Sequence, residues 1–302
     1  MTITVGVAGI TGKICPVGRE EPVQFTRHPD SCFSENPFGC LSSKGDSTDL
    51  ETLQCFSRGC KVVTCCYLGD NDFMTKGQKL LVDACELENV SRYIARDYCL
   101  DFTKLELGQH PAKDPMKHVK AHLETKKNVK GVHMLIGAFM GTFLSGYFGV
   151  WDQEVFKLNY YGTGDELWES TTYDPAAQHV AAVANDRNAV GRQYFLGDRR
   201  NIQEIAQNFA DIYEKKPQLE RLGSLDDLYN KMQATFQNDP SNIVAYIAMF
   251  YQYHCTNGRT YLKKDLDNLK YPKISPAAFK DFLQAHKIAD LSDAYQNAGS
   301  EV

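Results

Sequence analysis

The first half of the chain alternates between apolar runs and stretches with helical spacing. Residues 3–7 and the VVTCCY run at 62–67 have the unbroken, β-branched character of buried parallel strands. Apolar residues recur with helical period at 49–56 and 75–88, each preceded or opened by acidic residues. The series continues with a strand at 92–95, a helix at 115–127 and a strand at 132–136. This alternation predicts a doubly wound parallel sheet of the α/β class.

The second half is mostly helical in pattern. Two short strands are expected at 155–158 and 193–196, and Asn201 with Glu204 forms a capping pair for one of the helices. The helices predicted by spacing span 175–183, 202–215, 225–237, 242–253 and 276–287.

The stretch 132–150 has His133 as its only ionisable residue, so a membrane span has to be weighed. Glycines at 137, 141, 146 and 149 interrupt it, and its flanks lack an anchoring pattern. We therefore predict a buried strand followed by an apolar helix.

Composition narrows the class of protein. With 302 residues, 43% hydrophobic and 24% charged, the chain can bury one large core or two interlocked ones. A net charge of -5 gives no electrostatic reason to expect nucleic acid or an anionic membrane as a partner. Ten scattered cysteines without a CxxC pair, and an N-terminus without a signal pattern, predict reduced thiols in a cytoplasmic protein.

A glycine fingerprint, GVAGITG at 6–12, follows the first strand. In a dinucleotide site such glycines permit a tight turn and close approach to a pyrophosphate. Gly6, Gly9, Thr11 and Gly12 are therefore the predicted cofactor-binding residues. The helix that should follow is missing, because KICPVGREEP at 13–22 contains two prolines and a glycine. The irregular segment 15–44 has the composition of a long surface loop.

Several segments together resemble the NmrA-like and isoflavone reductase-like branch of the atypical short-chain dehydrogenases/reductases. They are GVAGITG, KGDSTDLETL, GCKVVTCC, ENVSRYIARDY, PAKDPMKHVKAHLE and YFLGDRRNIQEIAQNFADIY, in the order of the family. The resemblance implies a Rossmann-like domain over residues 1–150 that binds NADP(H). It also implies a smaller, mostly helical substrate region over 151–302 and reduction of an aromatic or alkaloid-like small molecule, such as a secondary metabolite.

The resemblance also assigns roles at the cofactor site. In VQFTRHP, Arg27 takes the place of the arginine that faces the 2'-phosphate of NADP, and Asp46 and Asp49 resemble acidic residues that bracket the adenine. Helix capping explains Asp49 equally well. A parallel crossover needs about a dozen residues, which leaves open whether 23–26 pairs beside the first strand. Segment 15–44 fits either an alternative splice form or a rebuilt, cofactor-independent site.

Lys120 is the catalytic candidate, because family reductases carry a lysine on the helix after the fifth strand. Lys117 is the alternate, since the spacing after PAK differs by one residue, and a solvated basic face is the competing explanation for both. A lysine there orients a nicotinamide ribose or donates a proton. The chain has no Tyr-x-x-x-Lys pair, so the usual acid of short-chain dehydrogenases is absent.

Arg96 stands where the family motif RFIPSEFG has a serine, and Asp97 and Tyr98 keep its acidic and aromatic character. Such an arginine would contact a phosphate, fill the cofactor space, or form a structural ion pair with Asp97. We favour the ion pair, because buried charges are usually paired. His118 and His122 have metal-ligand spacing but lack a third ligand, so no metal is predicted.

Aromatic residues downstream suggest the floor of an apolar substrate cleft, with core packing as the alternative. They are Tyr160, Tyr161, Trp168 and Tyr173, near Phe139, Phe143, Tyr147, Phe148 and Trp151. The leading hypothesis is an NADP(H)-dependent reductase or isomerase of a small, largely apolar molecule, as a monomer or homodimer. The alternatives are a non-redox rearrangement or cyclisation enzyme, and an NAD(P)-sensing regulator that binds a protein partner.

Overall fold

The computed structural model describes residues 3–9, 34–35, 41–42 and 45–293. The chain divides into two compact units, each built from several stretches. The first comprises Met1–Tyr98, Pro111–Met134 and Ala177–Gln193, and the second comprises Cys99–His110, Leu135–Ala176 and Tyr194–Val302. A single domain boundary at residue 150 stays a prediction.

A five-stranded sheet forms the centre of the first unit, in the order β1-β4-β5-β6-β11. β1 pairs in parallel with β4, and β4 with β5. The strands are β1 (Val5–Ala8), β4 (Val62–Cys65), β5 (Arg92–Cys99), β6 (Lys130–Leu135) and β11 (Gly191–Tyr194). The predicted parallel sheet is confirmed.

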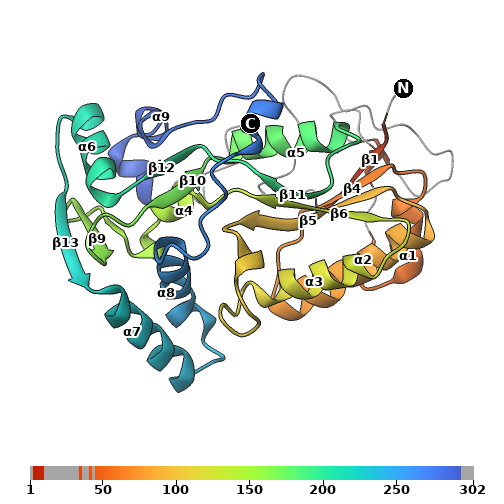
Figure 1. Ribbon diagram of the computed structural model, residues 1–302, viewed down its shortest axis with the longest axis horizontal. Coiled ribbons are helices and arrows are strands. Elements are labelled where there is room, and N and C mark those ends of the chain that lie inside the picture. The colour runs from red at the N-terminus through yellow and green to blue at the C-terminus, as the bar shows by residue number, and fades with distance from the viewer. Residues whose placement is uncertain (1–2, 10–33, 36–40, 43–44, 294–302) are drawn as a thin grey trace. The chain divides into compact units, whose positions relative to one another are not determined.

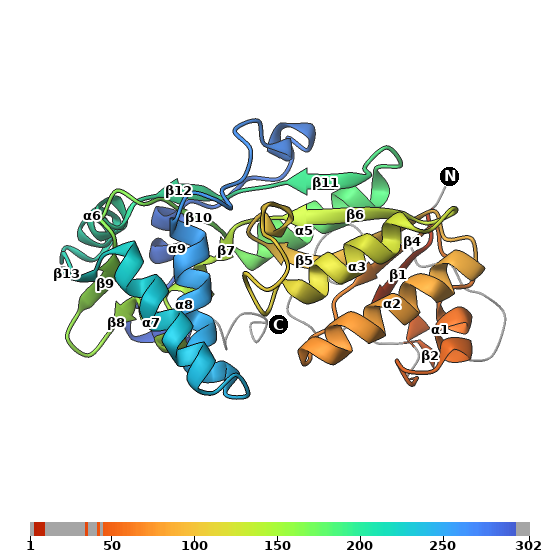
Figure 2. The ribbon, with the colours of Figure 1, turned by 60° about the horizontal axis from the view of Figure 1, so that its bottom comes forward.

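Helices cover both faces of this sheet. Figure 1 and Figure 2 show α1, α2 and α3 on one face and α5 on the other. Their bounds are Leu50–Ser57, Asn71–Leu87, Asp114–Glu124 and Tyr173–Asn185. Helix α2 begins four residues before the predicted start, because the Asp70 carboxylate accepts a hydrogen bond from the Phe73 amide at 2.8 Å and caps the helix there.

The core of the first unit lies between the sheet and helices α1 to α3. Val63, Cys65, Leu81, Tyr93 and Ala95 are among its fully buried members. Burying a large aliphatic side chain stabilises the fold by roughly 1.5–3 kcal/mol. Burial on this face therefore contributes to the stability of the parallel sheet.

Arg92, at the start of β5, is buried against the C-terminal end of α5. Its guanidinium donates hydrogen bonds to the carbonyl oxygens of Val183, Ala184 and Asp186 at 2.8, 2.6 and 2.7 Å. The last carbonyls of a helix have no partner within the helix. Arg92 supplies those partners and fixes α5 on the sheet.

The second unit contains two three-stranded sheets, β12-β10-β7 and β13-β9-β8, together with helices α6 to α9. The strands are β7 (Ala138–Phe139), β8 (Trp151–Asp152), β9 (Lys157–Tyr161), β10 (Trp168–Thr171), β12 (Asp198–Arg200) and β13 (Gln218–Gly223). The helices are α6 (Ile202–Tyr213), α7 (Leu225–Asn238), α8 (Ile243–Thr256) and α9 (Phe279–Gln284). The predicted capping box is confirmed, because Asn201 and Glu204 bond reciprocally to each other's backbone amides.

The predicted buried strand before residue 150 is confirmed as β6, and the apolar helix predicted after it is only four residues long. After β6 the chain forms β7, the four-residue helix α4 (Met140–Phe143) and a 3-10 turn at Gly146–Phe148. Gly137 has a φ of +70°, and a Cβ there would lie 2.3 Å from the Glu169 carbonyl oxygen. This close approach, which only glycine permits, turns the chain at Gly137, so helix α4 cannot continue directly from β6.

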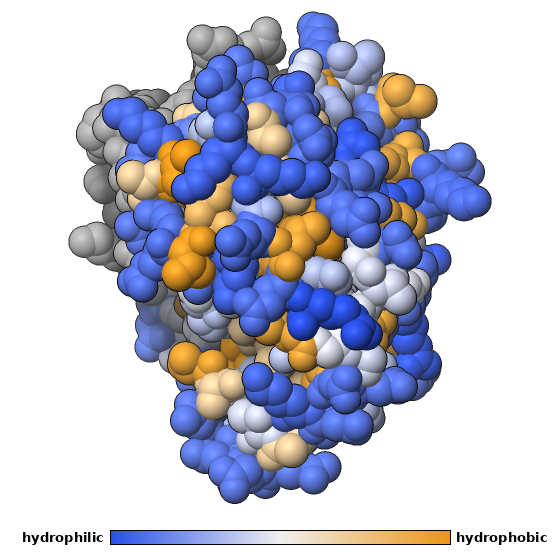
Figure 3. Space-filling view, turned by 90° about the vertical axis from the view of Figure 1, so that its left-hand side faces the viewer, coloured by the Kyte–Doolittle hydropathy of each residue, from blue (hydrophilic) through white to orange (hydrophobic). Residues whose placement is uncertain are grey.

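None of the helices within the described ranges is both long and apolar enough to cross a membrane. Figure 3 shows the face of the second unit that carries α6 and β13, where hydrophobic residues occur as separate spots among hydrophilic ones. The exposed leucines of β13, Leu219 and Leu222, are 37% and 45% accessible. Scattered exposed leucines of this kind are ordinary on protein surfaces.

Candidate functional site

Gly6 and Gly9 lie in β1 and directly after it. A Cβ on Gly6 would lie 3.0 Å from the Phe56 ring, so this glycine lets α1 pack closely on the strand. Gly9 has a φ of +85°, and its Cβ would lie 3.0 Å from the Cys66 carbonyl group. Both a side chain and an ordinary backbone conformation are therefore excluded at Gly9.

The other predicted residues of this turn are not in the described part of the chain. Thr11, Gly12 and Arg27 fall outside it, as do the helix-lacking stretch 13–22 and the uncertain strand at 23–26. Their roles stay predictions.

The two acidic residues of the GDSTDL segment, Asp46 and Asp49, are both exposed. Asp46 accepts hydrogen bonds from the Thr48 amide and hydroxyl at 2.8 and 2.7 Å, which lower the pKa of its carboxyl group. Asp49 accepts from the Thr52 amide at 2.9 Å and caps α1. The capping explanation is confirmed for Asp49, while an adenine-side role for Asp46 stays a prediction.

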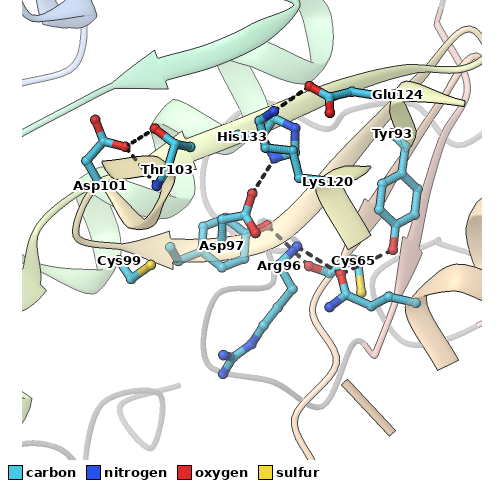
Figure 4. Close-up of polar contacts among 12 residues, drawn as sticks. Cys65, Tyr93, Arg96, Asp97, Cys99, Asp101, Thr103, Lys120, Glu124 and His133 are labelled. Atoms are coloured by element: carbon cyan, nitrogen blue, oxygen red, sulfur yellow. Dashed lines mark hydrogen bonds and ion pairs between the residues drawn. The ribbon is translucent and has the colours of Figure 1, made fainter. Parts of the chain in front are cut away.

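Lys120 and Lys117 lie on successive turns of α3. The Lys120 ammonium pairs with Glu124, so its side chain extends toward the C-terminal end of the helix (Figure 4). Lys117 stands three residues closer to the helix N-terminus, about 4.5 Å along the axis. That end follows the carboxyl end of β5, where ligands of open α/β sheets bind.

Asp97, near the carboxyl end of β5, pairs with His133 of β6. Its Oδ2 atom lies 2.5 Å from His133 Nδ1, and both side chains are buried (Figure 4). The favoured expectation of an Arg96–Asp97 pair is therefore wrong. Neighbouring residues of a strand point to opposite faces, so Arg96 and Asp97 leave β5 in opposite directions.

Gln78 of α2 holds the backbone at this end of β5. Its Oε1 atom accepts from the Arg96 amide at 3.2 Å and from the Tyr93 hydroxyl at 3.4 Å, and its Nε2 donates to the Met74 carbonyl. Strand β5 pairs with β4 only as far as Ile94. Beyond Ile94, the Gln78 side chain accepts the backbone hydrogen bond that a neighbouring strand would otherwise accept. The sequence signal was a polar residue on the apolar face of the predicted helix 75–88, and it was missed.

Burial keeps the other ionisable groups around this strand end neutral. It raises the pKa of the Cys65 thiol to about 11 and holds the pKa of the Tyr98 phenol well above its usual value. Cys60, Cys65 and Cys85 are buried free thiols. None of these groups is a reactive anion near neutral pH.

A separate small cavity of about 10 Å³, room for about one water molecule, lies within the second unit and is partly open to solvent. Tyr160, Tyr161 and Trp168 of the predicted aromatic floor line it, together with Val150, Ile202, Leu228, Asn159, Gly164, Glu166, Gln252 and Thr256. The Asn159 Oδ1 atom is buried and accepts no hydrogen bond from any described residue. Tyr173 instead stacks on Phe139, with ring centroids 4.0 Å apart.

His118 and His122 of α3 do not form a shared metal site. His122 Nε2 lies 2.7 Å from Asp83 Oδ1, which also pairs with Lys126 at 2.5 Å. His118 is exposed. Among the described residues no group of three metal-ligating side chains occurs.

Comparison with known proteins gives a consistent fold. No family model and no curated protein matches the sequence. An isoflavone reductase structure superposes with a TM-score of 0.73 at 16% identity, over 94% of this chain and 99% of that one. The chain has the isoflavone reductase-like fold.

Two further structures extend the likeness to cofactor complexes. AtPrR2, solved with NADP+ and (+)pinoresinol, has a TM-score of 0.68 at 16% identity over 82% of both chains. The triphenylmethane reductase of Citrobacter sp., solved with NADP(H), has a TM-score of 0.59 at 17% identity, covering 80% of this chain and 81% of its own. The resemblance noted in the sequence is thus confirmed for the fold.

Proposed function

We propose that the chain is an NADP(H)-dependent reductase or isomerase that acts on a small, largely apolar molecule. The conformation of Gly9 carries this proposal. It leaves backbone, without side chain, at the carboxyl end of β1, which is where a Rossmann sheet receives a pyrophosphate. The likeness to NADP-bound reductase structures supports the same assignment.

The residues proposed to hold the cofactor are those of the glycine turn, with Arg27 at the 2'-phosphate and Asp46 near the adenine. When bound, NADPH supplies the hydride. The protein has to orient the nicotinamide and provide a proton. A lysine of α3 is proposed for that second task, with Lys120 first and Lys117 as the alternate.

The cavity of the second unit supports an apolar substrate. Its walls combine aromatic and aliphatic side chains with a few polar ones, and the buried Asn159 Oδ1 atom accepts no hydrogen bond from a described residue. Ligand sites commonly combine apolar walls with a few polar groups that fix orientation. A small aromatic molecule with a hydroxyl group would match these side chains, and its entry would require the cavity to widen, because it has room for about one water molecule.

Titration with NADPH and NADH, followed by nicotinamide fluorescence, tests the proposal. We expect NADPH to bind more tightly than NADH, and Gly9→Ala to weaken both. Gly191→Ala is the matched control, because Gly191 also has a positive φ of 69° but open space around its Cβ position. If neither cofactor binds at millimolar concentration, the redox function is wrong and the rearrangement or partner-binding alternatives take its place.

Two matched variants separate the lysines once a substrate turns over. Lys120→Met is expected to abolish turnover with NADPH binding intact, while Lys117→Met keeps activity. The reverse result assigns the proton to Lys117. Full activity in both variants would remove α3 from the chemistry.

A further inference from the structure

Arg96 has a charge that the described part of the protein does not compensate. It lies near the carboxyl end of β5 and is partly buried. Its backbone amide donates to Gln78, and its guanidinium has no hydrogen bond to a described residue and no described carboxylate within 4.0 Å. Partly buried guanidinium groups are ordinarily paired, so this arrangement calls for an explanation.

The ionisable groups around Arg96 cannot supply the missing anion. Asp97 projects from the opposite face of β5, where it pairs with His133 (Figure 4). Cys65 and Tyr98 are the other groups that feel the charge of Arg96, and burial keeps both protonated at neutral pH. An anion at this position has to come from outside these groups.

The surroundings of Arg96 hold its backbone in place. Gln78 fixes the Arg96 amide, and Gln78 is itself fully buried and anchored to Met74. Strand β5 lies two positions from β1 in the sheet, about 10 Å away at ordinary strand spacing. Arg96 thus stands at the same edge of the sheet as the Gly9 turn.

We propose that Arg96 is the anion-binding residue of this edge and takes a carboxylate or phosphate group of a bound ligand. A guanidinium presents paired N–H donors that match both groups in a bidentate manner. The inference deepens the proposed function, on which it rests, by assigning an oxyanion to the ligands of that site. The oxyanion belongs either to the cofactor or to a substrate that carries an acidic group.

Selective modification of the wild-type protein tests the assignment without any variant. Phenylglyoxal labelling at Arg96 and at exposed Arg187 is followed by peptide mass spectrometry, with NADPH, 4-hydroxybenzoate or neutral 4-hydroxybenzyl alcohol present. We expect at least one of the two anionic probes to slow labelling of Arg96 and the neutral alcohol to leave it unchanged. Labelling at Arg187, which has no part in the site, should not respond to any probe.

Variants then identify the source of the oxyanion. Arg96→Gln should weaken binding of the protecting probe by roughly tenfold or more, the loss expected for a charge-assisted hydrogen bond. Arg187→Gln should leave binding unchanged. A loss confined to NADPH assigns a cofactor phosphate, and a loss confined to 4-hydroxybenzoate assigns a substrate carboxylate.

Failure of this inference differs from failure of the proposed function. If NADPH binds tightly but no anionic probe protects Arg96, and Arg96→Gln binds every probe as the wild type does, the anion site is wrong and the reductase proposal stands. If neither cofactor binds while 4-hydroxybenzoate still protects Arg96, the anion site stands and the reductase proposal is wrong.

Discussion

Two arginines on the same face of one strand serve opposite purposes. Arg92 and Arg96 are four residues apart on β5, so they project from the same side of the sheet. Arg92 is buried and its guanidinium is covered by carbonyl groups of α5, whereas Arg96 has only its backbone bonded within the described chain. The amino end of the strand is thus built for stability, and the carboxyl end keeps a charge for a ligand.

Replacing Arg92 should produce the largest effect. Arg92→Met leaves several α5 carbonyl groups buried without donors, and we expect a loss of roughly 3 to 5 kcal/mol in the free energy of unfolding. Urea unfolding followed by circular dichroism measures it. Arg96→Met is the matched control and should cost less than about 1 kcal/mol. Equal losses in the two variants would break the comparison.

His254 of α8 is a buried side chain that can carry a positive charge, as Arg92 does, but it can also lose its proton. Burial lowers its pKa to about 4, although its Nε2 bonds to the Gln109 carbonyl at 3.0 Å. The unfolded chain, with a pKa near 6.5, binds the proton first as the pH falls. The contribution of neutral His254 to the free energy of unfolding is therefore fully present above about pH 6.5. It falls by about 3 kcal/mol as the pH is lowered to 4.

Unfolding measured across this pH range tests that expectation against His254→Gln. The variant keeps a donor for Gln109 but cannot titrate, so its stability should fall less steeply with acid than that of the wild type. Arg259 also lowers the His254 pKa, so in Arg259→Gln that pKa should rise, and the loss of stability should be slightly smaller and end at a slightly higher pH. Parallel curves for the wild type and His254→Gln would show that His254 is not the source.

A variant of Gln78 tests how the backbone at the carboxyl end of β5 supports Arg96. Gln78→Met keeps the volume but removes the acceptor for the Arg96 amide and the Tyr93 hydroxyl, and should cost about 1 to 2 kcal/mol. Thermal unfolding measures the stability, and titration with the probe that protects Arg96 measures the site. We expect both to weaken, because Gln78 fixes the backbone from which Arg96 projects; a stability loss with unchanged probe binding would separate them.

The smallest effect is expected at Arg58, which is half exposed and pairs with Glu88 at 3.3 Å. Arg58→Gln should cost less than about 1 kcal/mol, because exposed pairs gain little in water. The difference from the wild type should shrink further in high salt. If Arg58→Gln lost as much stability as Arg92→Met, the difference in burial between Arg58 and Arg92 would not explain their contributions to stability.

Much of the fold could be predicted because its elements have local signals. The helix from Ile202 follows a capping box, and the strand at Val62–Cys65 is an unbroken apolar run. The segment after β6 was predicted only in part, because its apolar residues do not show that the helix is limited to α4 or that β7 precedes it. The decisive contact, the Glu169 carbonyl against Gly137, joins residues far apart in sequence and leaves no local trace.

The candidate site was predictable only in part, for a related reason. Gly6 and Gly9 follow from a motif, but the partner of Asp97 is His133 of another strand, which adjacency in sequence did not reveal. The alternation of side chains along β5 already separates Arg96 from Asp97, and applying it would have corrected the expected pair. The role of Gln78 could be predicted only by asking which backbone amides of β5 have no hydrogen-bond partner in a neighbouring strand.

The clamp made by Arg92 also has a consequence for protein synthesis. Its carbonyl partners lie 91 to 97 residues later in the chain. At about 5–20 residues per second, a ribosome needs roughly 5 to 20 seconds to deliver them after Arg92 itself. During that interval the nascent chain has the central strand but not the helix end that neutralises its charge, so we expect the first unit to close only after residue 186 has emerged.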